Sequence, residues 1–497
     1  MKRSGTGRTA LLASLLVLLA MTGGPTLSLS MERPTPQEIA TLRQAGELEQ
    51  RKAFARDIGN QRIRPDLLKR ALQRARRAAL SARGVSTETI DRLAPAAPPR
   101  ALAGMPTTGN VKTFALLIDF PDYPHTSSLE YIHERLYGAG NPADAPLESL
   151  SAFYRRSSYG LLELSGGSTL GWYRTSYNRS AIAQTLTGRE NLIKEALNYF
   201  QAQGHDFSQY DNNGNGMIDY FIVIWAGPDN GWANFWWGYQ TNFNDATYRI
   251  GGKRLNSYSW QWESRPAGGY FSPRVAIHET GHGLGLPDYY DYDGAVGPDG
   301  GVGDLDMMDG NWGDHNCFSK WVLEWITPTV VANGAQTLTL QPSATTTNAV
   351  LIMPGATLDN TFSEFFMVQN RYRTGNDTTI PSDGLLVWHV DAALTPSGYD
   401  YLYNNSYTTP KLLRLMEADG REEIERNIPA NAGDFYRPGA RFGPTTLPSS
   451  ASYSGRNTGV LVTGITQSGD GFSATFSVSD LGKPLAPPGN LTIQPRN

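Results

Sequence analysis

Apolar residues recur at helical spacing in several stretches of the first two thirds of the chain. Five segments show this spacing: residues 36–50, 65–83, 128–137, 149–157 and 190–203. Between the later ones, apolar runs rich in β-branched and aromatic residues, such as residues 111–120 and 221–226, predict buried strands. The pattern therefore predicts a domain that contains both helices and strands.

Beyond residue 328 the pattern changes to short alternating strands with turn residues between them. Residues 384–390, which read GLLVWHV, are one such strand. A regular series of this kind is typical of a β-sandwich. We therefore expect an all-β sandwich domain over residues 329–480, followed by a proline-rich tail at residues 481–497.

The N-terminus has the pattern of a secretory signal. Lys2, Arg3 and Arg8 precede an apolar run at residues 10–21, which is too short to span a bilayer comfortably. We expect residues 1–30 to be a signal peptide, so that the protein is secreted or is retained in a periplasm. No cysteine stands at the junction for lipid attachment, so we expect no stable membrane anchor.

Residues 31–105 differ from the rest in being charged, arginine-rich and poor in aromatic residues. Their helical spacing and the proline-rich linker at residues 92–100 predict a helical pro-region. Such a region either inhibits the domain that follows it or assists its folding; alternatively, its basic face is merely solvated. It contains no cysteine, which excludes a thiolate that caps a metal.

The composition is that of a globular protein. The chain has 497 residues, 40% of them hydrophobic, and a net charge of −4. No basic stretch interleaved with aromatic residues follows the N-terminal region, so we expect no nucleic-acid partner, and we expect a monomer. Cys317 is the single cysteine, which excludes an intramolecular disulfide.

The strongest chemical signal lies in residues 275–291, which read VAIHETGHGLGLPDYYD. His278 and His282 are four residues apart, so on a helix both imidazoles leave the same face one turn apart. Two histidines with Glu279 beside them form a pair of metal ligands with a base. A helix with two solvated histidines is the structural alternative.

A catalytic zinc site needs a third protein ligand and an open position for water. Gly285 can end the helix with a positive φ, and Pro287 prevents the helix from resuming. Asp288 then follows where a returning chain can present a carboxylate. We therefore predict zinc ligands at His278, His282 and Asp288, with Glu279 as the general base that takes a proton from a water whose pKa the metal lowers.

The segment HETGHGLGLPDYYD resembles the immune-inhibitor-A-like (M6) family of secreted bacterial metalloproteases, and its HExxHxxGxxD spacing is similar to that of metzincins. Residues 116–122 and 149–173 also resemble M6 sequence. The stretch DLDMMDGNW, residues 304–312, resembles the family's methionine turn, with Met308 in register and Met307 as its competitor. An ordinary core position is the alternative for this methionine pair.

This resemblance implies an α+β metzincin-like zinc protease domain over residues 106–328. It further implies a secreted zinc metalloendopeptidase that hydrolyses protein or peptide substrates. The strand at residues 221–226 is expected nearest the metal, with substrate added along a sheet edge. Two other functions stay open: a non-catalytic cell-surface binding protein with a protease-like domain, and a zinc hydrolase of non-peptide substrates.

A second candidate metal site lies at residues 210–220, YDNNGNGMIDY. Asp211, Asn213, Asn215 and Asp219 occupy positions 1, 3, 5 and 9 of a calcium-loop pattern. Position 12 is Ile222 in place of the usual glutamate, so the loop is not a complete EF-hand. The alternatives are a calcium site of low charge and an Asn/Gly-rich β-turn.

Two further choices stay open in the sequence. The residue that stabilises the oxyanion is not assigned, and Tyr289, Tyr290 and His315 are candidates by their proximity in the sequence. His389 and Asp391 lie close together on one expected strand, where an isolated histidine is more often structural than a ligand of a second metal.

Overall fold

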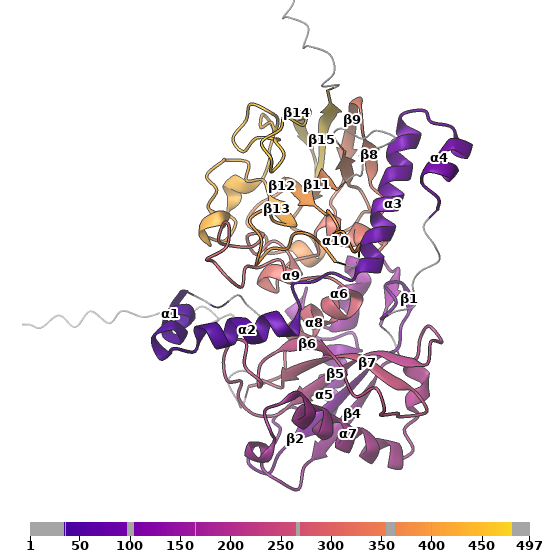
Figure 1. Ribbon diagram of the computed structural model, residues 1–497, viewed down its shortest axis with the longest axis vertical. Coiled ribbons are helices and arrows are strands. Elements are labelled where there is room, and N and C mark those ends of the chain that lie inside the picture. Colours follow the sequence, from indigo (N-terminus) through magenta and orange to yellow (C-terminus); the bar gives the residue numbers. More distant parts are fainter. Residues whose placement is uncertain are drawn as a thin grey trace, which may run out of the picture.

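The computed structural model describes residues 34, 36–96, 104–164, 166–264, 269–353, 363–398 and 400–479. In Figure 1 a region of helices around one sheet forms the lower part of the molecule, and β-strands form the upper part. The expected signal peptide and the proline-rich tail lie outside the described residues, as does part of the expected linker. None of the helices in these ranges is long and apolar enough to cross a membrane.

A five-stranded sheet forms the centre of the lower part, with the strand order β4-β2-β5-β7-β6. Its strands are β2 (Phe114–Asp119), β4 (Ser168–Arg174), β5 (Met217–Trp225), β6 (Tyr239–Asn242) and β7 (Arg254–Trp262). The first four strands of this order run parallel, and β6 pairs antiparallel with β7 at the edge. Alternate side chains of β2 and β5 point to opposite faces, and all of them except the first residue of β5 are buried, so both faces need a cover of helices.

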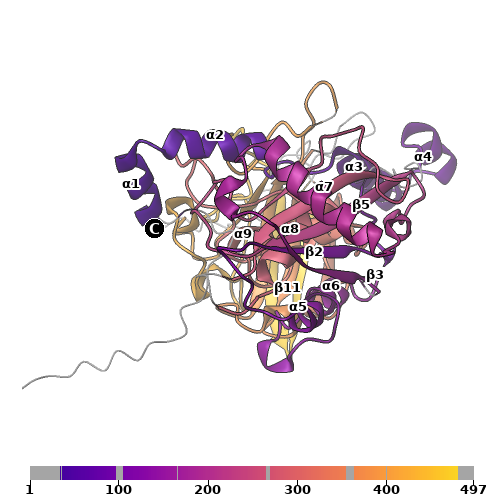
Figure 2. The same ribbon diagram turned by 90° about the horizontal axis from the view of Figure 1, so that it is seen from below.

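Different helices cover the two faces of this sheet (Figure 2). Phe114 and Leu116 pack with α7 (Leu186–Ala202) on one face. Ala115 and Leu117 share a core on the other face with α5 (Leu129–Leu136), α6 (Leu150–Ser157) and α8 (Arg274–Leu284). The sheet thus supports α8, the helix that carries the HExxH motif.

The position of β5 corrects one expectation from the sequence. Residues 221–225 lie in β5, which is paired on both sides, with β2 and with β7, and residue 226 follows the strand. The strand at the open edge near α8 is β6. A fully apolar run is more compatible with an interior strand than with an edge, so the apolar character of this segment already disfavoured an edge position.

The C-terminal half consists of two packed sheets. One has the order β13-β12-β11-β10-β8 and the other β14-β15-β9. The strands are β8 (Thr329–Val331), β9 (Gly334–Leu340), β10 (Val350–Ile352), β11 (Glu364–Arg371), β12 (Gly384–Asp391), β13 (Leu413–Leu415), β14 (Val460–Ser468) and β15 (Gly471–Val478). Phe366, Val387, Val462 and Phe476 share the core between the sheets. The mixed α/β structure agrees with a protease domain and a β domain.

The larger C-terminal sheet also packs against the first domain. Met367 and Trp388 belong to the same core as Phe318 and Trp321 of the segment around α10 (Cys317–Val322). The four-residue helix α9 (Met307–Gly310) lies in the chain between α8 and α10. One continuous apolar core therefore joins the two domains.

The N-terminal region is helical, as predicted. It contains α1 (Pro36–Ala45), α2 (Leu48–Ile58), α3 (Pro65–Ala82) and α4 (Thr87–Leu93). After this region, the short strand β1 (Gly109–Asn110) pairs in parallel with β3 (Leu162–Glu163). The expected single helix over residues 36–50 is broken at Gly46, which has φ +73. Leu67 and Ala71 of α3 are buried in the core of the first domain, so this region is packed and not merely solvated.

Candidate metal centre

Helix α8 positions the two histidines of the HExxH motif. It ends at Leu284 because Gly285 adopts the left-handed conformation with φ 110, as the sequence predicted. At its other end, Arg274 donates hydrogen bonds to the carbonyl oxygens of Gly310 and Asn311 (2.7 and 2.8 Å). The helix is therefore fixed to the turn that follows it in the chain.

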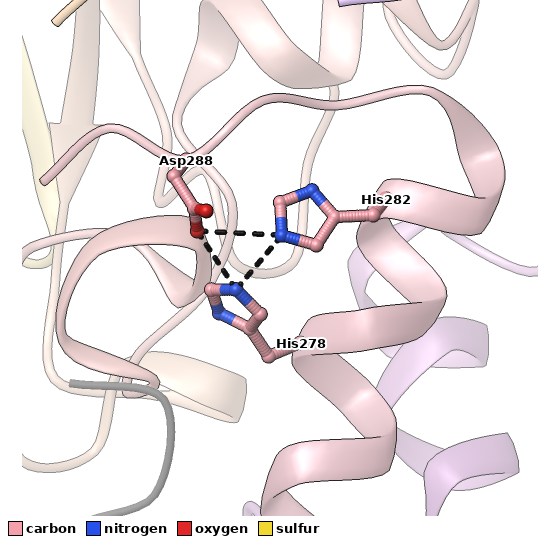
Figure 3. Close-up of side chains that lie close together, drawn as sticks. All are labelled: His278, His282 and Asp288. Atoms are coloured by element: carbon pink, nitrogen blue, oxygen red, sulfur yellow. Dashed lines mark hydrogen bonds and ion pairs between the residues drawn. The ribbon is translucent and has the colours of Figure 1, made fainter. Parts of the chain in front are cut away.

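Three side chains converge beside this helix (Figure 3). The Nε2 atoms of His278 and His282 lie 3.1 Å apart. Oδ1 of Asp288 lies 2.9 Å from the first of these nitrogens and 3.3 Å from the second. The three residues are buried, so these short distances are made away from bulk water. The structure thus brings together the three ligands predicted for zinc.

The outer nitrogen of each histidine contacts a backbone carbonyl. Nδ1 of His278 lies 2.9 Å from the oxygen of Met307, and Nδ1 of His282 lies 2.8 Å from the oxygen of Leu286. A carbonyl only accepts, so each Nδ1 carries the proton and each Nε2 presents a lone pair inward. Together with Asp288 Oδ1, three acceptor atoms then face one another, and such atoms repel unless a cation lies among them.

The donor set fits zinc. Zinc prefers four ligands in a tetrahedron, with bonds of about 2.0–2.1 Å to nitrogen and oxygen, which implies ligand separations of about 3.3 Å. The three separations observed here, 2.9–3.3 Å, are close to that value. The backbone acceptors on both Nδ1 atoms are the outer partners that orient metal-binding histidines. Tyr292 adds another, because its hydroxyl donates a hydrogen bond to Asp288 Oδ2.

Glu279 lies next to this cluster and is fully buried. Within the described ranges neither of its carboxylate oxygens accepts a hydrogen bond that meets the usual geometric limits. The pKa of Glu279 is raised to about 8, chiefly by burial and also by the charge of Asp288, against the opposite effects of His278 and the backbone amide of Gln240. Gln240 belongs to β6, so the glutamate lies between the metal ligands and the open edge of the sheet.

Both methionines of the predicted turn lie under α8. The carbonyl of Met307 holds His278, as described above. The sulfur of Met308 packs against α8 at Gly281, where an added Cβ would lie 2.4 Å from it. Glycine at this position therefore makes room for the Met308 side chain, and the assignment of Met308 as the turn methionine stays a prediction with this contact in its favour.

The loop at residues 211–219 is closed by hydrogen bonds. Asp211 accepts two loop amides (3.0 and 2.9 Å) and the ammonium group of Lys253 (2.7 Å). The side-chain oxygens of Asn213 and Asn215 also accept loop amides (3.1 and 2.9 Å), and Asn213 donates to Asp219 (2.8 Å). These bonds describe a compact turn, and calcium at this loop stays a prediction.

The three candidates for the oxyanion partner lie in different surroundings. Tyr289 is bonded to Ser319 (2.7 Å) within the core. His315 is enclosed by aromatic rings, with Nδ1 3.6 Å from Asp306. Tyr290 lines a small pocket. Burial raises the pKa of its hydroxyl, and the charges of Asp288 and Glu279 raise it as well. Tyr290 therefore has the position most compatible with this role.

His389 lies far from these residues in the fold, on β12 of the C-terminal sheet. Its Nε2 contacts Glu364 (2.9 Å), and its ring stacks between Phe366 and Tyr453. Burial lowers the pKa of His389. These contacts are those of a structural histidine, in agreement with the preferred interpretation of the sequence.

Two contributors to the site were not found from the sequence. Tyr292, the partner of Asp288, follows it by four residues in an irregular segment whose course no periodicity predicts. Asn60 of the N-terminal region accepts a hydrogen bond from the Asp288 amide (2.8 Å) through its carbonyl oxygen. A backbone contact between residues so distant in sequence leaves no signal in residue types.

Comparison with known proteins gives distant relatives. No family model matches the chain. It is 28% identical to the pre-pro-metalloprotease PrtV of two Vibrio cholerae serotype O1 strains, over 43% of this chain and 29% of that protein. It is 25% identical to immune inhibitor A of Bacillus thuringiensis subsp. alesti, over 37% of this chain and 34% of the relative.

These matches support an M6-like metalloprotease. The matched stretches span about a third of the length of these curated relatives. They therefore support a peptidase in general terms, while the metal, the mechanism and the substrate of this M6-like chain have to be argued from its own residues.

Proposed function

We propose that this protein is a secreted zinc endopeptidase with a metzincin-like catalytic domain. One observation carries the proposal: the lone pairs of His278, His282 and Asp288 converge within 3.3 Å beside the buried carboxylate of Glu279. The metalloprotease relatives support the same conclusion. The predicted signal peptide supports secretion.

Each side chain has a distinct role in this proposal. Zinc bound at the three ligands supplies a Lewis acid that activates water and polarises a substrate carbonyl. Glu279 takes a proton from the attacking water on its carboxylate and delivers it to the leaving amine. Because Glu279 is fully buried, bulk water does not reach its carboxyl group to take that proton between the two steps. Tyr290 is the candidate donor to the developing oxyanion.

The sheet edge supports an extended peptide as the substrate. β6 pairs with β7 on one side only, and the amide of Gln240 in β6 lies near Glu279. An extended peptide can add to such an edge by main-chain hydrogen bonds. This geometry would place a peptide bond next to the base without a requirement for a chain end, which favours endopeptidase activity.

The enzyme proposal is tested by casein hydrolysis, with and without a zinc chelator. Wild type should lose activity with the chelator and regain it with added zinc. Glu279→Ala should lower activity by about 10²- to 10⁴-fold, the range for general-base catalysis, while zinc stays bound. Glu134→Gln, on the exposed face of α5, is the matched control. Zinc binding without cleavage of casein or of end-blocked peptides would favour a binding protein or a non-peptide hydrolase.

We also propose that residues 31–105 keep the enzyme inactive by covering the cleft. Helix α2 lies beside β6, with the ring of Phe54 5.6 Å from that of Tyr239. Arg51 donates to the carbonyl oxygen of Trp232 (3.1 Å), and Lys52 pairs with Asp293 (2.7 Å). The helix therefore occupies the edge where we place the substrate.

The segment after α2 reaches the loop that carries the third ligand. The carbonyl oxygen of Asn60 accepts the Asp288 amide, and Arg64 donates its amide to the carbonyl of Gly285 (3.0 Å). Further on, Arg70 and Arg74 of α3 both pair with Glu324 (2.8 and 2.6 Å). In this proposal the cover consists of backbone hydrogen bonds, an aromatic contact and ion pairs, and no described residue of the N-terminal region contributes a metal ligand.

The latency proposal is tested on the uncleaved chain. Phe54→Ala removes the ring that packs on β6. Basal cleavage of a blocked peptide should therefore rise by about tenfold, which corresponds to a loss of about 1.4 kcal/mol in the free energy that holds the N-terminal region on the domain. Ile90→Ala in α4 is the control, because Ile90 packs in a separate cluster with Leu80. Equal basal activity in wild type, in the variant and after removal of residues 31–105 would exclude an inhibitory role.

A further inference from the structure

A second cluster of acidic side chains follows strand β13 in the C-terminal domain. Glu417, Asp419 and Asp434 each place one carboxylate oxygen within 4.8 Å of the others. Glu417 is only 2% exposed and Asp434 is fully buried. Two buried carboxylates and one at the surface thus share a small volume, in a part of the chain for which the sequence suggested no metal.

The two buried acids of the cluster, Glu417 and Asp434, have no basic partner among the described residues. Arg414 pairs with Glu422 and Glu425, and the largely exposed Arg421 lies 3.5 Å from Asp419. In the described part of the chain, no lysine or arginine forms an ion pair with Glu417 or Asp434.

Glu417 is instead held by backbone donors. Its two oxygens accept the amides of Glu423 and Ile424 (2.8 and 2.9 Å). Its carboxylate also contacts the carboxylate of Glu425, an interaction that raises the pKa of Glu417 in addition to the larger effect of burial. The backbone bonds fix the orientation of Glu417, but they do not neutralise the neighbouring acids.

One oxygen of Asp434 lacks a donor. Oδ2 of Asp434 accepts the amide of Asn431 (2.6 Å), whereas no donor among the described residues reaches the buried Oδ1, and the carboxyl group of Asp434 contacts that of Glu417. Oε2 of the neighbouring Glu425 accepts no such bond either, although Glu425 contacts Glu417 and pairs with Arg414 through its other oxygen. Leaving a buried charged oxygen without a partner is costly, and a cation is the ordinary remedy where several such oxygens converge.

We propose that Glu417, Asp419 and Asp434 bind a calcium ion, with Glu425 at its margin. The donors are all carboxylate oxygens, which suit hard cations, and no histidine or cysteine stands among them. Calcium accepts six to eight oxygens in flexible geometry, including bidentate carboxylates, whereas magnesium requires a near-ideal octahedron. An irregular group of carboxylates on one turn-rich segment therefore favours calcium. This site is separate from the loop at residues 211–219.

The position of the site gives the ion a structural role. Residues 417–434 pack on the glycine-rich loop that precedes the methionine turn: Ala430 donates its amide to the carbonyl of Gly303 (3.0 Å). At Gly300, which has φ +84, an added Cβ would lie 1.8 Å from the carbonyl oxygen of Ile424. Calcium would thus hold the segment that supports the loop leading to Met307, whose carbonyl orients His278.

Asp434→Asn in the full-length chain is the decisive variant. Its side-chain oxygen can still accept the Asn431 amide, and its new NH₂ group can donate to Glu417 in place of a like-charge contact. The variant should therefore fold with an unchanged or higher Tm in the presence of a calcium-selective chelator. Calorimetric titration with calcium alone should show one ion fewer per chain than in wild type.

Thermal unfolding gives an independent readout. Calcium at saturating concentration should raise the Tm of wild type by about 5 °C, and the response should fall by at least half in Asp434→Asn and in Asp419→Ala. Glu422→Gln, an exposed acid of the same segment, should respond as wild type does. Should Asp434→Asn fold poorly, Asp419→Ala tests the same prediction, since Asp419 is closer to the surface.

Two results would overturn the proposal. One is an identical calcium stoichiometry and an identical Tm response in wild type and both variants. The other is a wild-type protein that gains stability from mild acidification and none from calcium, which would mean that the carboxylates share a proton. Neither result depends on peptidase activity, so both are distinguishable from failure of the proposed function.

Discussion

The two metal sites predicted from the sequence differ in which atoms meet at their centres. At the HExxH helix, three hydrogen-bond acceptors face one another: the two histidine Nε2 atoms and Oδ1 of Asp288 lie 2.9–3.3 Å apart. The Nδ1 atoms point outward to backbone carbonyls. At residues 211–219, donor meets acceptor, since loop amides and Lys253 already satisfy the carboxylate of Asp211.

This difference separates a preformed metal site from a turn with the same kinds of residue. Like atoms held in contact store repulsion that a cation relieves, and the surrounding fold has to supply the energy to hold them. Paired donors and acceptors need no ion. The acidic cluster around Glu417 combines both situations, because backbone amides bind the oxygens of Glu417 while Oδ1 of Asp434 has no donor among the described residues.

The largest effect is expected from Asp288→Asn. The asparagine amide has no charge, and it presents to zinc either an amide oxygen, which is a weaker ligand than a carboxylate, or an NH₂ group. Zinc affinity should therefore fall by more than about 100-fold, which exceeds the effect expected for residues that only hydrogen-bond to a ligand. Casein hydrolysis should fall with it. Metal content after dialysis and activity at saturating zinc measure the two effects.

Asp299→Asn, in the exposed part of the following loop, is the control for Asp288→Asn. A variant that keeps zinc and full activity would show that Asp288 is not a ligand and would remove the contrast between the two sites.

A smaller loss is expected from Tyr292→Phe. Its hydroxyl donates to Asp288 Oδ2, and outer partners of this kind contribute about 10- to 100-fold to metal affinity. Competition with a chelator of known affinity measures the change. Tyr407→Phe is matched to it, because the ring of Tyr407 lies 6.2 Å from that of Tyr292. Equal zinc affinity in both variants would mean that the Tyr292 hydroxyl does not orient the ligand.

Lys253→Met tests the loop at residues 211–219, where Lys253 pairs with Asp211. Loss of the ammonium group leaves Asp211 with backbone donors alone, so the free energy of unfolding should fall by about 1 kcal/mol in calcium-free buffer. If the loop binds calcium, removal of this competing cation should also strengthen the calcium-dependent rise in Tm. Lys194→Met, which breaks the ion pair with Asp245 (2.6 Å), is the control. An equal calcium-dependent rise in Tm in wild type and in Lys253→Met would favour the β-turn alternative, because an ion bound at Glu417 contributes equally to both.

The smallest effect is expected on the pH dependence of stability, through His389, whose Nε2 lies 2.9 Å from the carboxylate of Glu364. Burial lowers the pKa of His389 in the folded state, so the unfolded chain takes up a proton first as the pH falls. Stability from this group is therefore present above about pH 6.5 and is lost below it, by less than about 1 kcal/mol between pH 7 and pH 5. Urea unfolding of His389→Gln should show a flatter pH dependence than wild type or His133→Gln. An unchanged slope would mean that other groups set it.

Local patterns in the sequence were sufficient for the centre of the candidate site. A spacing of four places His278 and His282 on one helical face, whatever the rest of the fold does. Gly285 ends that helix because its backbone reaches a positive φ at little cost. Gly285 and Pro287 restrict the conformations of the following chain, and in the structure Asp288 lies 2.9 Å from His278.

Patterns that depend on neighbours in space were less informative. An apolar run predicts a strand at residues 221–226 but does not say whether it is an edge, and the structure pairs it on both sides. The contact of Asn60 with Asp288 joins two backbone groups, which no side-chain pattern encodes. In the sequence, the acids around Glu417 are indistinguishable from ordinary surface charges, and only the structure shows that Glu417 and Asp434 are buried.

The sequence by itself thus determined the HExxH helix, its terminating glycine, the nearby aspartate and the division into a mixed domain and a β domain. Each of these follows from the intrinsic geometry of a helix, a strand or a turn. The tertiary structure alone decided which strand lies at the sheet edge near α8, which N-terminal helix packs beside that strand and which carboxylates are brought together. These features arise from packing between distant segments, where burial, more than residue type, sets the energy of a charge.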